Sequence, residues 1–173
     1  MAKEIELRRH TDADGDVLTD AGVEAALAIG AQLRGGYHLA VSSGAQRATQ
    51  TLACFLAALG QRIAAGVVIE PGLRSTVEDR WRAAYEQAGS GALDALREAD
   101  PELVADDAGR LGAALRRILD RLPEGGRALA VGHSPTNEAA VLGLTGELVP
   151  PLAKGAGVVV STEDDRYQVE ALA

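Results

Sequence analysis

The stretch Leu7-Arg8-Arg9-His10-Thr11 decides how this sequence is interpreted. It ends the run 4–8, in which apolar and polar residues alternate as in a β-strand, and it precedes a helix start at Leu18-Thr19-Asp20-Ala21-Gly22. An arginine beside a histidine at the carboxyl end of an early strand is poorly placed for packing in a core. The pair is well placed for chemistry, because open α/β sheets bind their ligands at the carboxyl ends of the strands.

Strand-like and helix-like segments alternate along the rest of the chain. Strands are expected at residues 5–8, 37–42, 67–70, 127–131, 158–161 and 167–172. Helices are expected at residues 20–34, 45–59, 76–87, 92–99, 107–122 and 134–144. Alternating β and α units of this length predict one domain, residues 1–173, with an α/β fold and a mostly parallel sheet.

The composition excludes several classes of function. The chain has 173 residues, of which 47% are hydrophobic and 24% are charged, as in an ordinary soluble globular protein. Its net charge of −8, without an evident basic patch, argues against a nucleic-acid partner. No apolar run approaches the roughly 18 residues of a membrane span, and the first residues lead directly into a strand pattern without a signal peptide. We therefore expect no membrane association and a cytoplasmic location.

Three strand-to-helix junctions carry a cationic or potentially cationic side chain. The first is Arg9-His10, the second is Arg47 and the third is His133. Arg47 falls in the first turn of a helix, where free N–H groups and the helix dipole favour an anion. Because the carboxyl ends of parallel strands lie at one edge of the sheet, these side chains outline a pocket for a doubly charged oxyanion. A phosphoryl group fits such a pocket best.

Taken together, these stretches resemble the histidine phosphatase superfamily, which includes the cofactor-dependent phosphoglycerate mutases and the phosphohistidine phosphatases. The matching motifs are Leu7-x-Arg9-His10 with Leu18-Thr19-x-x-Gly22, Ser42-Ser43-x-x-x-Arg47-Ala48-x-Gln50-Thr51, and Val131-Gly132-His133. They cover nearly the whole chain in order, and at this length it is most similar to the compact phosphohistidine-phosphatase-like members. The resemblance implies a three-layer α/β/α sandwich with a mostly parallel central sheet, as in phosphoglycerate mutase.

The resemblance also implies roles for individual residues. His10 would be the nucleophile that becomes phosphorylated. Arg9, Arg47 and His133 would bind the phosphoryl oxygens, and this suits a reaction that places charge on those oxygens in its transition state. A neutral imidazole is a good nucleophile when its other nitrogen is held by a hydrogen bond. No metal and no cofactor are expected, since three scattered histidines offer no metal-ligand spacing.

Two positions depart from the family pattern. Thr11 stands where glycine usually follows the Arg-His pair, and its hydroxyl could add a phosphate contact. Ser75 stands where many members carry a proton-donating glutamate. Glu78 is the first candidate to replace that acid and Asp79 the second, although either could be an ordinary charged residue on a solvated helix. A general acid contributes roughly 10²–10⁴-fold, and less for substrates with a good leaving group such as phosphohistidine.

Secondary candidates and rival functions complete the interpretation. Ser43 and Ser134 could donate hydrogen bonds to the phosphate or substrate, and Ser134 could instead be a plain helix cap. Gly132-His133-Ser134 also resembles the nucleophile elbow of a serine hydrolase, but Thr136 replaces its second glycine and no histidine follows Ser134. A binding protein that keeps the phosphate pocket without turnover is the stronger alternative.

The resemblance and the residues together predict a metal-independent phosphatase. His10 would attack the phosphoryl group, Glu78 or solvent would protonate the leaving group, and water would hydrolyse phospho-His10. The substrate is expected to be a phosphorylated small molecule or a phosphorylated protein side chain. The sequence does not distinguish these two, and it leaves the oligomeric state open.

Overall fold

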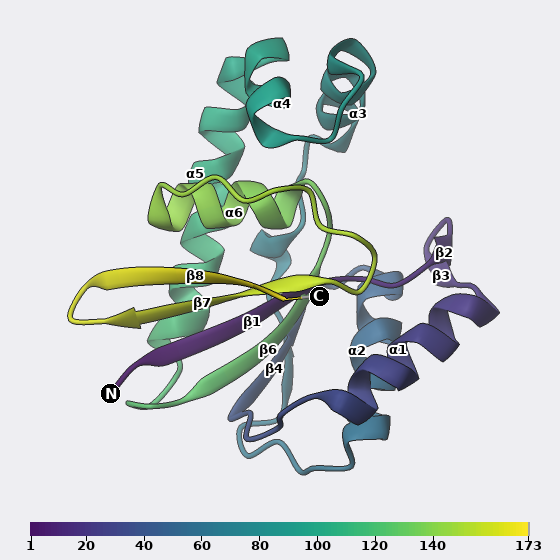
Figure 1. Cartoon of the computed structure of the whole chain (residues 1–173), viewed down its shortest axis with the longest axis vertical. Helices are drawn as coiled ribbons and strands as arrows, with labels where there is room; N and C mark the ends of the chain where they lie inside the picture. Colours follow the sequence, from purple (N-terminus) through teal and green to yellow (C-terminus); the bar gives the residue numbers. More distant parts are fainter. Residues whose placement is uncertain (173) are drawn as a thin grey trace.

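The computed structural model describes residues 1–172 and has a central sheet with the strand order β5-β4-β6-β1-β7-β8 (Figure 1). These strands are β1 (Lys3–Arg9), β4 (Leu39–Ser42), β5 (Val67–Ile69), β6 (Arg127–Gly132), β7 (Gly157–Glu163) and β8 (Arg166–Leu172). β5, β4, β6 and β1 are parallel, whereas β7 and β8 are antiparallel to their neighbours. The predicted mostly parallel sheet is therefore confirmed. A small hairpin of β2 (Ala13–Asp14) and β3 (Val17–Leu18) was not anticipated from the sequence.

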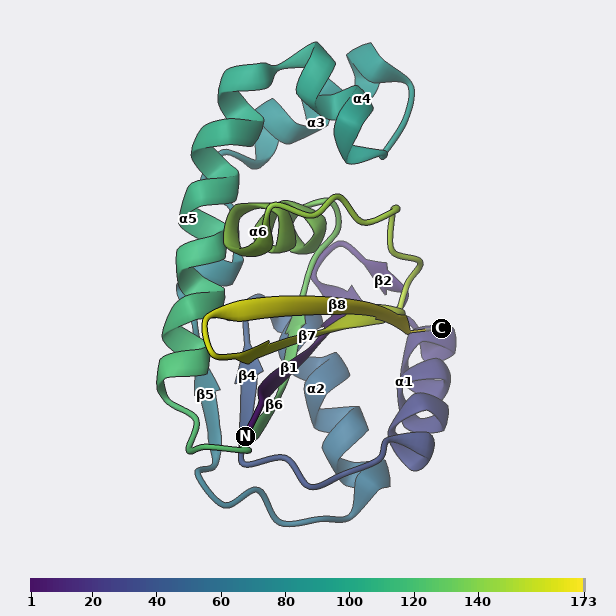
Figure 2. The ribbon, with the colours of Figure 1, turned by 60° about the vertical axis from the view of Figure 1, so that its left-hand side comes forward.

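Helices cover both faces of the sheet (Figures 1 and 2). α1 (Asp20–Gln32) and α2 (Gln46–Leu59) pack together on one face, and α5 (Pro101–Asp120) and α6 (Thr136–Thr145) pack together on the other. α3 (Glu78–Ala88) and α4 (Leu93–Ala99) lie beyond α6, after the short 3₁₀ helix η1 (Pro71–Leu73). These layers form the expected α/β/α sandwich. Within residues 1–172, no helix combines the length and apolar character needed to cross a membrane.

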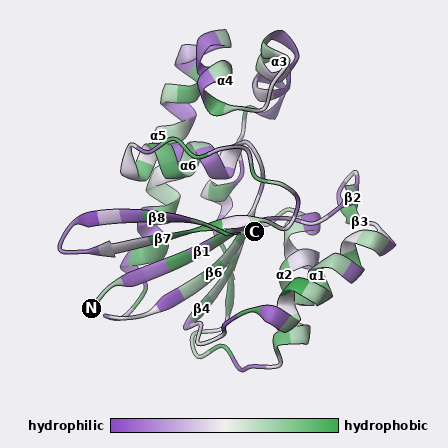
Figure 3. Cartoon of the chain, in the orientation of Figure 1, coloured by the Kyte–Doolittle hydropathy of each residue, from purple (hydrophilic) through white to green (hydrophobic). Residues whose placement is uncertain are grey.

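The central strands are buried on both faces, which explains their continuous apolar sequence. Leu39 and Val41 of β4 belong to the core on the α5 side, and Ala40 between them belongs to the core on the α2 side. In β6, Leu129 and Val131 face α2 in the same way. Successive strand residues point to opposite faces of a sheet, so one strand supplies both cores. Figure 3 shows the hydrophobic residues gathered along these strands.

Local signals explain most helix boundaries. The Thr19 hydroxyl caps α1 by accepting a hydrogen bond from the Gly22 N–H at 3.0 Å, as its sequence position predicts. The expected start of the fifth helix at residue 107 is wrong, because Asp100 caps α5 and Pro101 occupies its first position. The alternative role of Ser134 as a helix cap is also wrong. α6 begins two residues later, and the Ser134 hydroxyl donates to Glu138 instead.

α5 and α6 approach each other closely at two glycines. A Cβ atom at Gly112 would lie 2.7 Å from the backbone carbon of Gly143, and a Cβ atom at Gly143 would collide with the carbonyl oxygen of Ala108. Both neighbours are backbone atoms, so neither can move aside cheaply. This contact fixes the position of α6, and α6 begins just after His133 at the carboxyl end of β6.

The glycine contact predicts opposite effects for two Gly→Ala substitutions. Gly143→Ala should lower the free energy of unfolding by about 1–3 kcal/mol, because the added methyl group overpacks the helix contact. Gly109→Ala, on α5 with open space around it, should raise that free energy by about 0.5–1 kcal/mol. Urea denaturation of both variants measures the difference. Equal stability of the Gly143→Ala variant and the wild type would contradict the close packing.

Candidate active site

The carboxyl ends of β1, β6 and β4 meet at one edge of the sheet. The His10 N–H donates to the carbonyl of Gly132 at 3.0 Å, and the Ser43 N–H donates to the carbonyl of Val131 at 3.1 Å. The first contact joins the Arg9-His10 junction to the His133 junction, and the second joins the junction that carries Arg47 to the His133 junction. The ring centroids of His10 and His133 lie 5.4 Å apart, with an angle of 62° between the ring planes.

His10 is held in one tautomer by a backbone hydrogen bond. Its Nδ1 lies 2.7 Å from the carbonyl oxygen of Thr11. A carbonyl can only accept, so Nδ1 carries the hydrogen and Nε2 of the neutral ring keeps a free lone pair. Burial lowers its pKa below 6.5, the Thr11 carbonyl opposes this shift, and the positive charges of Arg47, Arg9 and Lys154 reinforce it. His10 is therefore neutral at physiological pH, as a nucleophile must be.

His133 is also neutral but presents a donor. Its Nε2 lies 2.8 Å from Ser43 Oγ, which accepts a hydrogen bond from the Ala45 N–H at 3.3 Å. The Ser43 hydroxyl can donate its hydrogen to Nε2, and in that tautomer the ring hydrogen resides on Nδ1. Burial, followed by the charge of Arg47, lowers the pKa of His133 to about 3. In the described part of the chain, the buried Nδ1 has no hydrogen-bond partner.

Thr11 and Ser43, for which the sequence predicts substrate contacts, bond within the protein instead. The Thr11 side chain is 1% exposed, and its hydroxyl donates to the carbonyl of Gly22 at 2.8 Å. Its N–H donates to Thr51 Oγ1 at 3.2 Å. The Ser43 hydroxyl holds His133. In this structure the Thr11 hydroxyl hydrogen is thus bound to Gly22, and the Ser43 hydroxyl contacts His133, so both residues position backbone or side chains around the site.

Arg9 and Arg47 bring permanent positive charge to this edge. Arg9 Nη1 donates to the carbonyl of Leu152 at 2.9 Å, while its buried Nε has no partner among the described residues. Arg47 lies in the first turn of α2, as the sequence predicts, and its Nη1 donates to Asp16 Oδ1 at 2.9 Å. The guanidinium groups stay charged at any working pH. Together with His133 Nδ1, they form a set of donors suited to an oxyanion.

Asp16 is a site residue that the sequence reasoning missed. It lies in the turn between β2 and β3, and its carboxylate accepts from the backbone N–H groups of Gln46 and Arg47 at 3.2 Å each. Partial burial opposes its ionisation, but these hydrogen bonds and the Arg47 guanidinium hold the pKa of Asp16 below its usual value. An internal carboxylate thus occupies an anion position at the N-terminus of α2. Two-residue strands leave no sequence pattern that could have revealed it.

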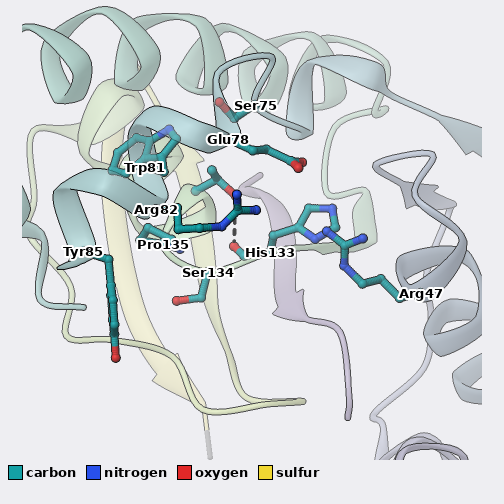
Figure 4. A pocket seen from close by; sticks show the side chains of 10 residues that line it. Arg47, Ser75, Glu78, Trp81, Arg82, Tyr85, His133, Ser134 and Pro135 are labelled. Carbon is teal, nitrogen blue, oxygen red and sulfur yellow. Dashed lines mark hydrogen bonds between the residues drawn. The ribbon is translucent and has the colours of Figure 1, made fainter. Parts of the chain in front are cut away.

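A cavity of about 260 Å³ lies beside His133 (Figure 4). It is lined by Arg47 and His133 on one side and by residues of α3 on the other, and Ser134 also faces it. Glu78 lines the wall, and its carboxylate accepts from Arg74 Nε at 2.9 Å. Asp79 is 94% exposed and is not among the lining residues. Of the two predicted acids, only Glu78 therefore faces the cavity.

Ser75, at the position where many family members have glutamate, has a structural contact. Its hydroxyl donates to Asp107 Oδ2 at 2.6 Å, and Trp81 Nε1 donates to the same oxygen at 2.6 Å. Asp107 is buried in α5, so these hydrogen bonds fix the α3 wall of the cavity against the body of the protein. Ser75 therefore holds the wall of the cavity in place and does not supply a proton.

The arrangement offers little to a serine hydrolase or a metal enzyme. The Ser134 hydroxyl donates to Glu138 Oε2 at 2.5 Å, and the neighbouring His133 is bonded to Ser43, so no imidazole activates Ser134. Within residues 1–172, no group of three or more His, Cys, Asp or Glu side chains is placed to hold a metal ion. The chemistry available here is that of arginines, two neutral imidazoles and carboxyl groups.

Comparisons with known proteins identify relatives of this fold. Residues 2–153 match the family model described as the histidine phosphatase superfamily (branch 1). No curated protein matches the chain significantly. Similar solved structures include phosphoglycerate mutase from Bacillus anthracis str. Sterne (20% identity, 99% of this chain and 92% of that chain, TM-score 0.74). Another is the protein histidine phosphatase SixA complexed with tungstate (19% identity, 98% of this chain and 96% of that chain, TM-score 0.66). A third is mycobacterial glucosyl-3-phosphoglycerate phosphatase (17% identity, 99% of each chain, TM-score 0.68). At these identities the likeness establishes a shared fold.

The protonation state of His133 can be tested directly. Long-range ¹H–¹⁵N NMR of the imidazoles should show a neutral ring with the hydrogen on Nδ1 from pH 8 down to about pH 4, since the pKa lies near 3. Ser43→Ala should remove the donor to Nε2 and mix the two tautomers. His38, just before β4, provides an internal reference signal. A titration of His133 near pH 6.5 would contradict the assignment.

The Asp16 contact predicts tighter phosphate binding when its charge is removed. Asp16→Asn keeps an acceptor oxygen but no longer competes by charge for Arg47, so the Kd for inorganic phosphate should fall about two- to fivefold at low salt. Isothermal titration calorimetry provides the measurement. Asp14→Asn on the same hairpin, an exposed residue, is the matched control. Weaker binding by the Asp16 variant would show that its carboxylate supports the site.

Proposed function

The chain belongs to the histidine phosphatase superfamily (branch 1) and is a phosphatase, and from this premise we propose that it acts through a phosphohistidine on His10. Its substrate is a phosphomonoester or a phosphoramidate. One observation carries the proposal. His10, whose Nδ1 is bonded to the Thr11 carbonyl, follows Arg9 in the chain, and its ring centroid lies 5.4 Å from that of His133. Among the described residues, Arg9 Nε and His133 Nδ1 are buried and have no hydrogen-bond partner. A phosphoryl group supplies acceptors for the two donors and an electrophile for the nucleophile.

In the first step, His10 Nε2 attacks phosphorus opposite the leaving group. The bond between Nε2 and phosphorus forms as the bond from phosphorus to the leaving oxygen or nitrogen breaks. Arg9, Arg47 and His133 hold the phosphoryl oxygens, where charge accumulates in the transition state. The leaving group takes a proton from Glu78, the acid predicted from the sequence, or from solvent.

In the second step, water attacks phospho-His10 and releases inorganic phosphate. His10 leaves as a neutral imidazole, and its lowered pKa favours this form. The positive charge that the reaction needs comes from Arg9 and Arg47, so the proposed mechanism is metal-independent. Neither half of the reaction requires a cofactor.

The substrate class follows from the cavity and, by analogy, from the relatives. SixA is by its name a protein histidine phosphatase, and the mycobacterial relative acts on glucosyl-3-phosphoglycerate. We infer for this chain a phosphorylated side chain of a protein or a phosphorylated small molecule. The leaving group would occupy the 260 Å³ cavity beside His133.

Trapping the intermediate tests this function. The protein is mixed rapidly with 4-nitrophenyl phosphate and quenched in alkaline denaturant, because phosphohistidine is labile in acid. Mass spectrometry should detect one added phosphoryl group on the peptide containing His10, and a brief acid treatment should remove it. His10→Ala should lack the adduct, whereas His38→Ala should retain it. Phosphate binding without adduct or phosphate release would instead support the phospho-ligand-binding alternative.

A further inference from the structure

Glu138 is a buried carboxyl group for which the mechanism above has no role. It lies in the first turn of α6 and is 1% exposed. Its Oε2 accepts a hydrogen bond from the Ser134 hydroxyl at 2.5 Å, and its Oε1 has no partner in the part of the chain that the structure describes. Ser134 itself lines the cavity that also holds His133 and Arg47 (Figure 4). Ser134 therefore lies between a buried carboxyl group and the cavity proposed for the leaving group.

The surroundings of Glu138 keep a proton on it. Burial raises the pKa of Glu138 to about 7. Four groups oppose this shift without cancelling it: the Ser134 hydroxyl, the N–H of Glu138 itself, the positive charge of Arg9 on β1 and the N–H of Leu152. Glu138 thus keeps its proton to a higher pH than an ordinary glutamate does.

The other carboxyl groups around the site are bonded to cationic side chains. The pKa values of Asp12 and Asp16 lie below their usual range, the first chiefly because of a hydrogen bond from Lys154. Glu78 and Asp79 are exposed carboxylates in ion pairs with neighbouring arginines. Glu138, by contrast, has a raised pKa and no ion-pair partner among the described residues.

We propose that Glu138 supplies the leaving-group proton through the Ser134 hydroxyl, in place of Glu78 or solvent, an inference that rests on the proposed function. When Glu138 is protonated, its Oε2–H donates to Ser134 Oγ, and the Ser134 hydrogen can donate to the leaving oxygen. As the bond from phosphorus to that oxygen breaks and the bond to His10 Nε2 forms, the leaving oxygen takes the Ser134 proton. Ser134 takes the Glu138 proton at the same time.

The second step returns the proton. The oxygen of the attacking water bonds to phosphorus as the bond between phosphorus and His10 breaks. One hydrogen of the water stays on the released phosphate, and the other passes through Ser134 to the Glu138 carboxylate. The enzyme is thereby restored with a neutral His10 and a protonated Glu138. In this scheme Ser134 touches the reacting oxygen, whereas Glu138 acts through it.

A series of leaving groups tests the proposal. kcat/KM is measured for 4-nitrophenyl, phenyl and ethyl phosphate with the wild type, Glu138→Gln and Ser134→Ala. Loss of a general acid slows the reaction more as the leaving group becomes more basic. In both variants kcat/KM should therefore fall progressively further below the wild-type value along the series, reaching a loss of about 10²–10⁴-fold for ethyl phosphate. Glu78→Gln should keep the wild-type dependence on the leaving group, whatever its overall rate. Glu170→Gln, an exposed carboxyl on β8, is the matched control.

The pH profile provides an independent readout. For the wild type, kcat/KM with phenyl phosphate should rise through a pKa below 6.5 as His10 becomes neutral, and should fall above pH 7 as Glu138 loses its proton. Glu138→Gln should lack the alkaline fall but keep the acid limb. A merely structural role of Glu138 would lower the whole curve without changing its shape.

Two results would overturn the proposal. One is an equal fall in kcat/KM for all three substrates in Glu138→Gln and Ser134→Ala, which would indicate that the Glu138–Ser134 contact is structural. The other is a steeper dependence on the leaving group in Glu78→Gln alone, which assigns the acid to Glu78. Phosphate binding and thermal unfolding of each variant verify the fold, and Ser134→Ala keeps the test valid if Glu138→Gln does not fold. Failure of the proposed function itself is separate, because the wild type would then form no phosphohistidine with any substrate.

Discussion

The hydrogen bond from the His10 N–H to the carbonyl of Gly132 is the contact on which the rest of the site depends. It continues the β1–β6 ladder past the end of β1 and places two imidazoles from distant segments in contact. Gly132 has no room for a side chain, because a Cβ atom there would collide with Asn137 Oδ1. The same amide oxygen accepts from the His133 N–H at 3.2 Å, so α6 holds the backbone of His133 from the other side.

A single physical cause, burial, sets three protonation states around this contact. Removal from water disfavours the charged form of any group, so it lowers the pKa values of His10 and His133 and raises that of Glu138. In the proposed mechanism the site thereby combines a neutral nucleophile, a neutral imidazole that can donate and an acid with a raised pKa. Permanent charge is left to Arg9 and Arg47, whose guanidinium groups burial does not neutralise.

Much of this arrangement could be predicted from the sequence, because it follows from local patterns and from the geometry of parallel strands. Arg47 and His133 each follow a buried strand, and parallel strands bring such positions to one edge. The direction of a small hydroxyl could not be predicted, since Thr11 bonds to a carbonyl eleven residues away that only the tertiary fold brings near. Asp16 lies in a hairpin too short to leave a pattern. Glu138 looks like an ordinary acidic residue of a first helical turn, and only the structure shows that it is buried.

The carboxylate of Asp16 places a negative charge of the protein itself on Arg47. An anionic ligand must compete for Arg47 with this carboxylate, which is part of the same chain and always close by. A monovalent anion such as chloride or acetate offers Arg47 no more charge than Asp16 does, whereas a phosphate dianion offers more and can also engage Arg9 and His133. The Asp16 carboxylate therefore favours divalent over monovalent anions at this site, whatever leaving group the ligand carries.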